Sequence, residues 1–241
     1  MGRRRKMEDA IVILGLGPLI QEDEDLIALF DGHGGLEVAS FLAKNFHKKL
    51  RYNLTQHPDP KEALRTTFLD MDQSFTKEKM CGSTAVVAYL KSQHLYIANC
   101  GDSRAVLGIK NFPPQRVSFD HKPSVLSEQK RIQEAGGVVI KLGETYRVNA
   151  VLSVTRAFGD FDLKPSVTVD PFIYELDLDE ENDYLILACD GIWDVMSDED
   201  AIDLVRSQGS PFKGALLLTQ TAFEKGSTDN LSAIVIKLSS T

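Results

Sequence analysis

Hydrophobic residues along the chain form short unbroken runs, and these runs predict strands. Leu26 to Phe30 is apolar without polar alternation and is too short for a helix, which predicts a strand buried on both faces. The runs from Asp183 to Asp190 and from Leu231 to Leu238 predict two further strands. Ser83–Leu90 and His94–Cys100 are separated by a short turn, so they predict an antiparallel hairpin.

Apolar residues at helical spacing predict the helices. The first predicted helix has a basic outer face. The second is capped by Asp59 and begins at Pro60. We expect helices over Leu36–Arg51, from Pro60 through an apolar stripe ending at Phe75, over Ser124–Ala135, from Ser197 to about Ser207, and from Pro211 to near Gly226. The region Val138–Pro171 is irregular, which indicates a binding loop or a lid.

The order of these elements predicts the fold class. Strands and helices are grouped in runs with few strict alternations, which favours an α+β fold over a doubly wound one. We therefore expect two packed antiparallel β-sheets flanked by α-helices. A length of 241 residues suits a single domain that covers residues 1–241.

Charge and composition exclude several classes of partner. The formal net charge of -8 argues against nucleic acid or a membrane surface as a partner, because both attract excess Lys and Arg. No stretch reaches the roughly 20 apolar residues of a membrane span, and the basic N-terminus lacks a signal peptide. The three cysteines follow no zinc or redox spacing, so we expect buried reduced thiols. A cytoplasmic location follows, with the nucleus as an alternative.

Acidic residues stand at the ends of the predicted strands. Asp31 follows one apolar run, Asp190 ends another, and Asp229 opens the last. Each acid alone is typical of a turn or of the surface. If the strands share one core, however, these carboxylates converge, and their repulsion requires a cation. With Glu8 and Asp9 they form an oxygen set that suits Mg²⁺ or Mn²⁺.

Short motifs from residue 3 to residue 236 resemble those of the metal-dependent type 2C protein phosphatases, also called the PPM family. In order they are RRRKMEDA, LFDGHGG, GSTAVVAYL, ANCGDSRAVL, FDHKPS, RIQEAGG, SVTRAFGD, ACDGIWDVMS and STDNLSAIVI. The resemblance covers nearly the whole chain. It implies a two-sheet antiparallel sandwich with a centre of two Mn²⁺ or Mg²⁺ ions at one end.

The resemblance also implies roles for individual residues. Asp31 is expected to bridge both ions, with the Gly32 carbonyl on one ion and Asp190 and Asp229 on the other. Glu8 and Asp9 are expected to hold metal-bound waters. Arg4 matches the arginine that binds the substrate phosphate, and its fork geometry suits that task better than Lys6.

Further residues are expected around this centre. His33 is expected to act as the general acid that protonates the leaving oxygen. Asn230 is expected to orient Asp229 or a water. A third, weaker metal is implied at Asp120, Asp190 and Asp194. His121 either orients Asp120, reaches the substrate or has a structural role, whereas Gly101-Asp102 forms either a turn or a support near the site.

The function implied is hydrolysis of phosphoserine and phosphothreonine monoesters in protein substrates. A hydroxide bridging two metal ions would attack phosphorus directly, without a phosphoenzyme. Two other functions stay open: a pseudophosphatase that serves as a protein-binding module on the same fold, and a metal-dependent phosphohydrolase of small molecules. The family usually has a strand ahead of the arginine motif, so we expect the chain to lack this strand or to be excised from a longer, multidomain protein. We expect a monomer.

Overall fold

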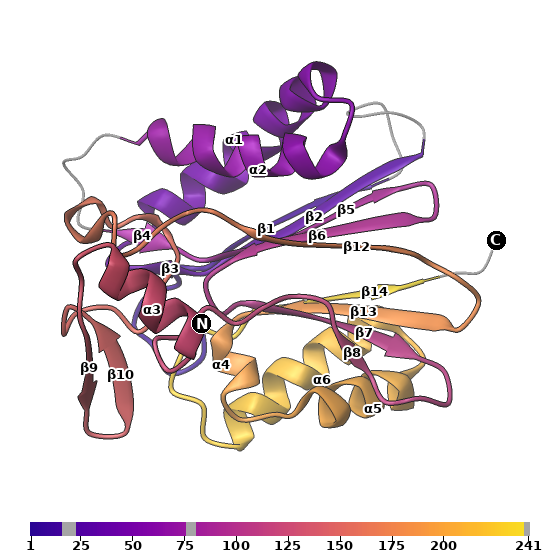
Figure 1. Cartoon of the computed structure of the whole chain (residues 1–241). Coiled ribbons are helices and arrows are strands. Elements are labelled where there is room, and N and C mark those ends of the chain that lie inside the picture. The colour runs from indigo at the N-terminus through magenta and orange to yellow at the C-terminus, as the bar shows by residue number, and fades with distance from the viewer. Residues whose placement is uncertain (16–22, 76–80, 239–241) are drawn as a thin grey trace.

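Two antiparallel sheets pack face to face in the computed structural model, and helices cover their outer sides (Figure 1). The structure describes residues 1–15, 23–75 and 81–238. The predicted α+β class, with two packed antiparallel sheets flanked by helices, is confirmed.

The first sheet contains five strands that are all antiparallel to their neighbours. In sheet order these are β1 (Ala10–Leu14), β2 (Glu24–Phe30), β5 (Ala85–Lys91), β6 (His94–Cys100) and β12 (Phe172–Asp177). The predicted strand at Leu26–Phe30 is therefore confirmed as part of β2, and the predicted hairpin is formed by β5 and β6.

The second sheet contains four strands, again antiparallel. They are β14 (Ala233–Lys237), β13 (Asn182–Ala188), β7 (Arg104–Ile109) and β8 (Gln115–Arg116). Two smaller sheets complete the strands. One orders β11 (Phe158–Gly159), β4 (Gly82–Ser83) and β3 (Gly32–His33), and the other is the hairpin of β9 (Val139–Leu142) and β10 (Thr145–Val148).

Two pairs of helices cover the outer faces of the sandwich (Figure 1). Over the first sheet lie α1 (Glu37–Gln56) and α2 (Pro60–Gln73), and over the second lie α5 (Asp198–Gln208) and α6 (Pro211–Glu224). Asp59 caps α2 by accepting a hydrogen bond from the Lys61 N–H at 2.9 Å, and Ser197 caps α5 in the same way through Asp200 at 3.1 Å.

The unbroken apolar run of β2 is explained by its position between two apolar layers. Leu26 and Phe30 point to α1 and α2, whereas Ile27 and Leu29 point to the second sheet. Successive side chains of a strand alternate between its faces, so a strand that is covered on both sides needs apolar residues at every position.

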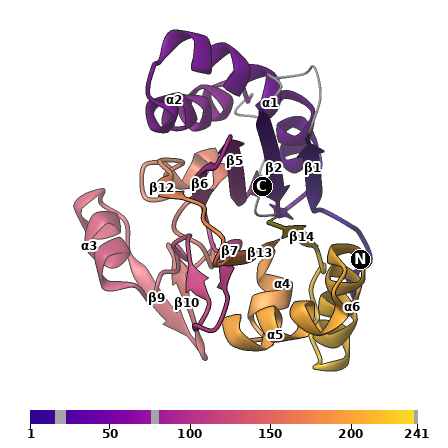
Figure 2. The ribbon, with the colours of Figure 1, turned by 90° about the vertical axis from the view of Figure 1, so that its right-hand side faces the viewer.

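The irregular region predicted at Val138–Pro171 contains short elements. The hairpin of β9 and β10, together with α3 (Leu126–Glu134), projects from one end of the sandwich (Figures 1 and 2). The chain returns through β11 and η1 (Phe161–Leu163), a turn of 3-10 helix. A buried carboxylate, Glu128 of α3, ties this region together by accepting hydrogen bonds from Arg131, Thr155 and Arg156.

Two expectations from composition can be compared with the structure. Cys81, Cys100 and Cys189 are all buried and form no disulfide, as predicted. Among the described residues, the helices are all too short or too polar to cross a bilayer.

Candidate metal centre

Three strands of the sandwich end in aspartates that lie close together. Asp31 follows β2, Asp102 follows β6 by two residues, and Asp190 follows β13 and begins the short helix α4 (Asp190–Trp193). Asp31, Cys189 and Asp190 offer ligand atoms that all lie within 4.8 Å of one another. The convergence of strand ends that the sequence predicts is therefore present in the fold.

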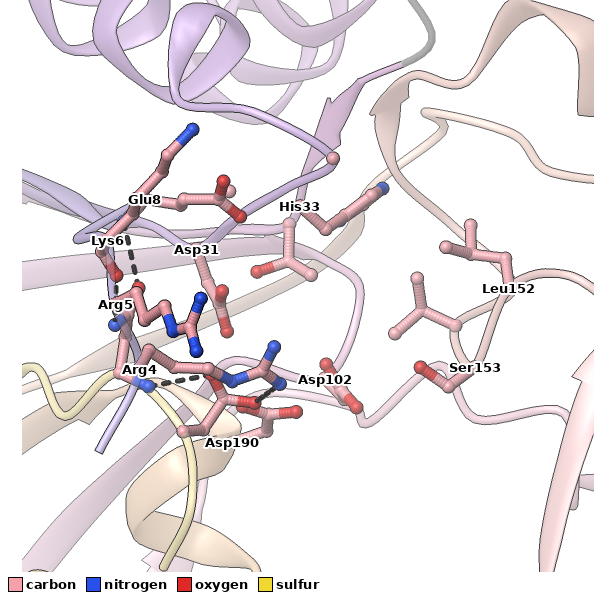
Figure 3. A pocket seen from close by; sticks show the side chains of 16 residues that line it. Arg4, Arg5, Lys6, Glu8, Asp31, His33, Asp102, Leu152, Ser153 and Asp190 are labelled. Carbon is pink, nitrogen blue, oxygen red and sulfur yellow. Dashed lines mark hydrogen bonds and ion pairs between the residues drawn. The ribbon is translucent and has the colours of Figure 1, made fainter. Parts of the chain in front are cut away.

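These acids line a pocket of about 370 Å³. The carboxylates of Asp31, Asp102 and Asp190 surround its floor (Figure 3). The basic N-terminal segment and residues 152–154 form two further parts of the lining. The remaining lining residues are Arg4, Arg5, Lys6, Glu8, Gly32, His33, Gly34, Thr84, Leu152, Ser153, Val154, Asp229 and Asn230.

Burial and repulsion by nearby carboxylates raise the pKa of each of these three aspartates. Burial is the largest cause in each case. The pKa of Asp31 is raised well above its ordinary value, with Asp190 as the strongest repelling charge. The pKa of Asp102 is raised to about 8 and that of Asp190 to about 6. Such a site favours protons or bound cations over free carboxylates.

The donor atoms suit a hard divalent cation. Asp9 Oδ1 and Asp102 Oδ1 are buried and have no hydrogen-bond partner among the described residues, so both are free to accept a metal-bound water or a cation. Cys189 is not a competing ligand. Its Sγ donates a hydrogen bond to the Asn230 carbonyl and accepts one from the Ser232 N–H. Burial also raises the pKa of its thiol. The site therefore offers oxygen ligands, which Mg²⁺ and Mn²⁺ prefer.

The N-terminal segment is fastened directly beside these acids. The Asn230 side chain accepts a hydrogen bond from the Glu8 N–H at 2.8 Å and donates to the Lys6 and Met1 carbonyls. Gly32 allows the close approach, since a Cβ on it would lie 2.4 Å from the Glu8 carbonyl oxygen. Glu8 thus lines the pocket, and the hydrogen bonds of the Asn230 side chain hold the backbone of the N-terminal segment.

Asp229 lines the pocket, and Asp9, which is not in its lining, lies close enough to Asp31 to interact with it. Asp9 Oδ2 accepts a hydrogen bond from the Ser232 hydroxyl at 2.6 Å, and burial raises the pKa of Asp9. Asp229 Oδ1 accepts from the backbone N–H of Asn230 at 2.7 Å, so Asn230 does orient Asp229, but through its backbone. Asp229 Oδ2 is paired with Arg4 at 2.7 Å. The predicted phosphate-binding arginine therefore contacts a predicted metal ligand.

His33 lies on the rim of the same pocket and is partly exposed. Its Nε2 is 2.7 Å from Asp160 Oδ2, a contact that the sequence analysis did not foresee. His33, the predicted general acid, therefore has an acidic partner and itself lines the pocket.

The predicted third-metal residue Asp120 does not lie in the pocket. Both of its oxygens are taken by Arg104, at 3.1 Å from Nε and 2.5 Å from Nη2, and Arg104 also binds Asp198. A carboxylate held by a buried guanidinium is a poor ligand for a further cation, so the structure contradicts this part of the prediction. Asp102 occupies the pocket where Asp120 was expected.

Asp194, the other predicted third-metal residue, is exposed and pairs with a lysine. Lys122 Nζ is 3.0 Å from Asp194 Oδ1 and 3.8 Å from Asp102 Oδ2. The ammonium group therefore lies between Asp194 and Asp102.

Two neighbouring residues have structural roles. Trp193 is buried, donates its Nε1–H to the Ala188 carbonyl at 2.9 Å and stacks under Arg104. His121 is buried, and burial lowers its pKa to about 3. Its Nδ1 is 3.0 Å from the Gly101 carbonyl, so it supports the loop that carries Asp102.

The sequence contains a signal that Asp102 belongs to the pocket. The segment HLYIANCGD is an apolar strand followed by an acid, which is the same pattern that identified Asp31 and Asp190. Gly101-Asp102 was interpreted first as a turn because Gly-Asp is common in turns. If acids at the ends of all predicted apolar strands converge, Asp102 belongs with Asp31 and Asp190.

The raised pKa of Asp102 predicts how the metal-free protein responds to pH. Because the folded-state pKa is about 8 and the ordinary value is 3.8, the folded protein binds the proton more tightly, and this contribution to stability is lost as pH rises towards 8. After chelation, the melting temperature is expected to fall between about pH 7 and about pH 8.5, a range above the ordinary pKa of histidine. Scanning calorimetry measures it.

Two comparisons test this prediction. Asp102→Asn has no carboxylate to ionise, so its melting temperature is expected to vary less over the same pH range. Saturating Mn²⁺ is expected to remove the decrease, because the cation stabilises the ionised acids. A metal-free wild type whose melting temperature rises with pH in this range would contradict the account.

Comparison with known proteins agrees with this geometry. The family model described as protein phosphatase 2C matches residues 1–231. A probable protein phosphatase 2C 52 of Oryza sativa subsp. japonica is 42% identical over 98% of this chain and 48% of its own length. Protein phosphatase 2C homolog 1 of Schizosaccharomyces pombe is 36% identical over 98% of this chain and 70% of its own length.

A solved structure shares the fold. The serine-threonine phosphatase 2C of Toxoplasma gondii superposes with a TM-score of 0.83 at 23% identity, covering 98% of this chain and 92% of that structure. The chain spans about half the length of the rice relative. Because the family model and the relatives match nearly the whole chain, the chain belongs to the protein phosphatase 2C family.

Proposed function

We propose that this chain is a metal-dependent protein phosphatase that hydrolyses phosphoserine and phosphothreonine in protein substrates. The observation that carries the proposal is the pocket floor, where buried acids with raised pKa values lie beside an arginine and a histidine on the rim. Family membership supports it, since the relatives are named protein phosphatases.

In this proposal Asp31, Asp190, Asp229 and the Gly32 carbonyl hold two Mn²⁺ or Mg²⁺ ions, and Glu8 and Asp9 hold their waters. When bound, such ions would supply a water of lowered pKa and would neutralise charge on the phosphate, so that water could attack phosphorus without a phosphoenzyme. The orphaned oxygen of Asp9 suits hydrogen bonding to such a water.

The remaining steps belong to side chains of the rim. Arg4 would bind the phosphate through its guanidinium. Its ion pair with Asp229 would then break, which would free the Asp229 carboxylate to bind a cation. His33 protonates the leaving oxygen of serine or threonine. Leu152, Ser153 and Val154 form the opposite wall, where they would contact the polypeptide around the phosphorylated residue.

Hydrolysis assays test the proposal directly. With Mn²⁺, the wild type is expected to hydrolyse both p-nitrophenyl phosphate and a phosphothreonine peptide, and EDTA is expected to abolish both activities. Asp190→Ala removes a buried ligand and is expected to lower kcat by at least about 100-fold, in line with the several kcal/mol that a metal ion supplies. Asp203→Ala, an exposed aspartate of α5, is the matched control.

The outcomes separate the alternatives. Activity that survives chelation or Asp190→Ala would contradict the metal mechanism. A folded wild type that binds Mn²⁺ but hydrolyses neither substrate would favour the pseudophosphatase, a binding module on the same fold.

A third, weaker cation is part of the proposal, and Lys122 gives a test of it. Since the Lys122 ammonium lies between Asp102 and Asp194, Lys122→Met removes a competing positive charge. The affinity for the weakest Mn²⁺ is expected to rise about tenfold, as befits loss of one charge at about 4 Å in a partly screened site. Isothermal titration calorimetry measures it, with Lys130→Met, whose partner is the exposed Glu134, as the control. An unchanged affinity would contradict this role of Lys122.

A further inference from the structure

The small sheet of β3, β4 and β11 brings His33 and Asp160 together. His33 pairs with Gly82, and Gly82 pairs on its other side with Gly159, the residue before Asp160. His33 and Asp160 are 127 positions apart in the sequence, yet His33 Nε2 is 2.7 Å from Asp160 Oδ2. In the part of the chain that the structure describes, no other hydrogen bond engages the His33 ring.

Gly82 makes room for this contact. A Cβ on Gly82 would lie 2.2 Å from Asp160 Oδ2 and 2.4 Å from His33 Nε2. Both distances are far below van der Waals contact, so the pair lies directly over the Gly82 Cα and a larger residue would separate it. The Asp160 side chain is only 10% exposed, which shields the contact from competing water.

The backbone of Asp160 is held in an unfavourable conformation. Its φ is +47°, in the left-handed region that residues other than glycine rarely adopt. The flanking segment is fixed from the side of α2. Asp72, largely buried, accepts hydrogen bonds from the Gly159 N–H at 2.8 Å and from Lys164 Nζ at 2.9 Å. The fold therefore retains a strained residue whose carboxylate points at His33.

We propose that Asp160 is a positioning residue that fixes the orientation and the tautomer of His33. Its carboxylate accepts the hydrogen on Nε2, so the ring cannot rotate freely and Nδ1 is the nitrogen left to exchange a proton with the substrate. This inference rests on the proposed phosphatase activity. The ring that donates carries a hydrogen on both nitrogens. As the P–O bond breaks, the leaving oxygen takes the Nδ1 proton, which leaves a neutral ring whose Nε2–H still faces Asp160, and solvent then returns a proton to Nδ1.

The test compares two leaving groups. Nitrophenolate departs without a proton, whereas a threonine alkoxide needs one, so loss of a correctly oriented acid slows only the second. Asp160→Asn keeps the shape of the side chain and tolerates the left-handed backbone. With Mn²⁺, it is expected to lower kcat for a phosphothreonine peptide by roughly 10- to 100-fold, the range for loss of a partner that orients a histidine, with little change in KM.

For p-nitrophenyl phosphate, the same substitution is expected to lower kcat by less than about threefold, because no proton is required. The matched control is Asp162→Asn, an exposed aspartate two residues further on, in η1, which is expected to behave as the wild type with both substrates.

A double-mutant cycle tests whether Asp160 acts through His33. In a His33→Gln background, Asp160→Asn is expected to cause no further loss on the peptide, because the ring that it orients is gone. Nitrogen NMR of the histidine rings gives a readout independent of activity. The chain has five histidines, so His33→Gln assigns the His33 signals. In the wild type, the signals are expected to show a proton on Nε2, and Asp160→Asn is expected to change them.

The outcomes that overturn the inference differ from those that overturn the function. Equal losses of kcat on both substrates, additive losses in the cycle, or unchanged ring signals in Asp160→Asn would each refute a positioning role while leaving the phosphatase activity intact. A wild type inactive on both substrates with Mn²⁺ would refute the function, and the positioning role with it.

Discussion

Repulsion among buried carboxylates is the interaction on which the rest of this structure depends. Asp31, Asp102 and Asp190 lie at the ends of three strands and line the same pocket, with Asp102 buried and Asp31 and Asp190 partly buried. In addition to burial, Asp190 raises the pKa of both Asp31 and Asp102, and Asp102 also raises the pKa of Asp31. Isolated carboxylates in such surroundings are unfavourable, so the arrangement persists in a folded protein because cations or protons compensate it.

The apolar sandwich holds this cluster in place. The strands that end in the acids are covered on both faces, which fixes their register and therefore the direction of each terminal aspartate. The charged partners come from more distant segments. Arg4 reaches Asp229 from the N-terminal segment that Asn230 fastens, and Asp160 reaches His33 across Gly82. A rigid core thus carries the acids, and shorter segments carry the groups that we propose contact a substrate.

Local pattern in the sequence predicted the fold and part of the site. The apolar runs identified β2 and β13, and the acid at the end of each pointed to the pocket. The prediction was wrong for Asp120 because nothing near it in the sequence shows that Arg104, on β7, takes both of its oxygens. The contact between His33 and Asp160 was likewise invisible, because it depends on the pairing of three two-residue strands that carry almost no hydrophobic pattern.

Anomalous X-ray diffraction from crystals grown with MnCl₂ tests the central claim most directly, because it locates the cations that would compensate the acids. The account predicts two strong manganese peaks that share the carboxylate of Asp31, with Asp190 and Asp229 among the ligands of one of them. Strong manganese peaks elsewhere on the protein, with none at Asp31, would contradict it.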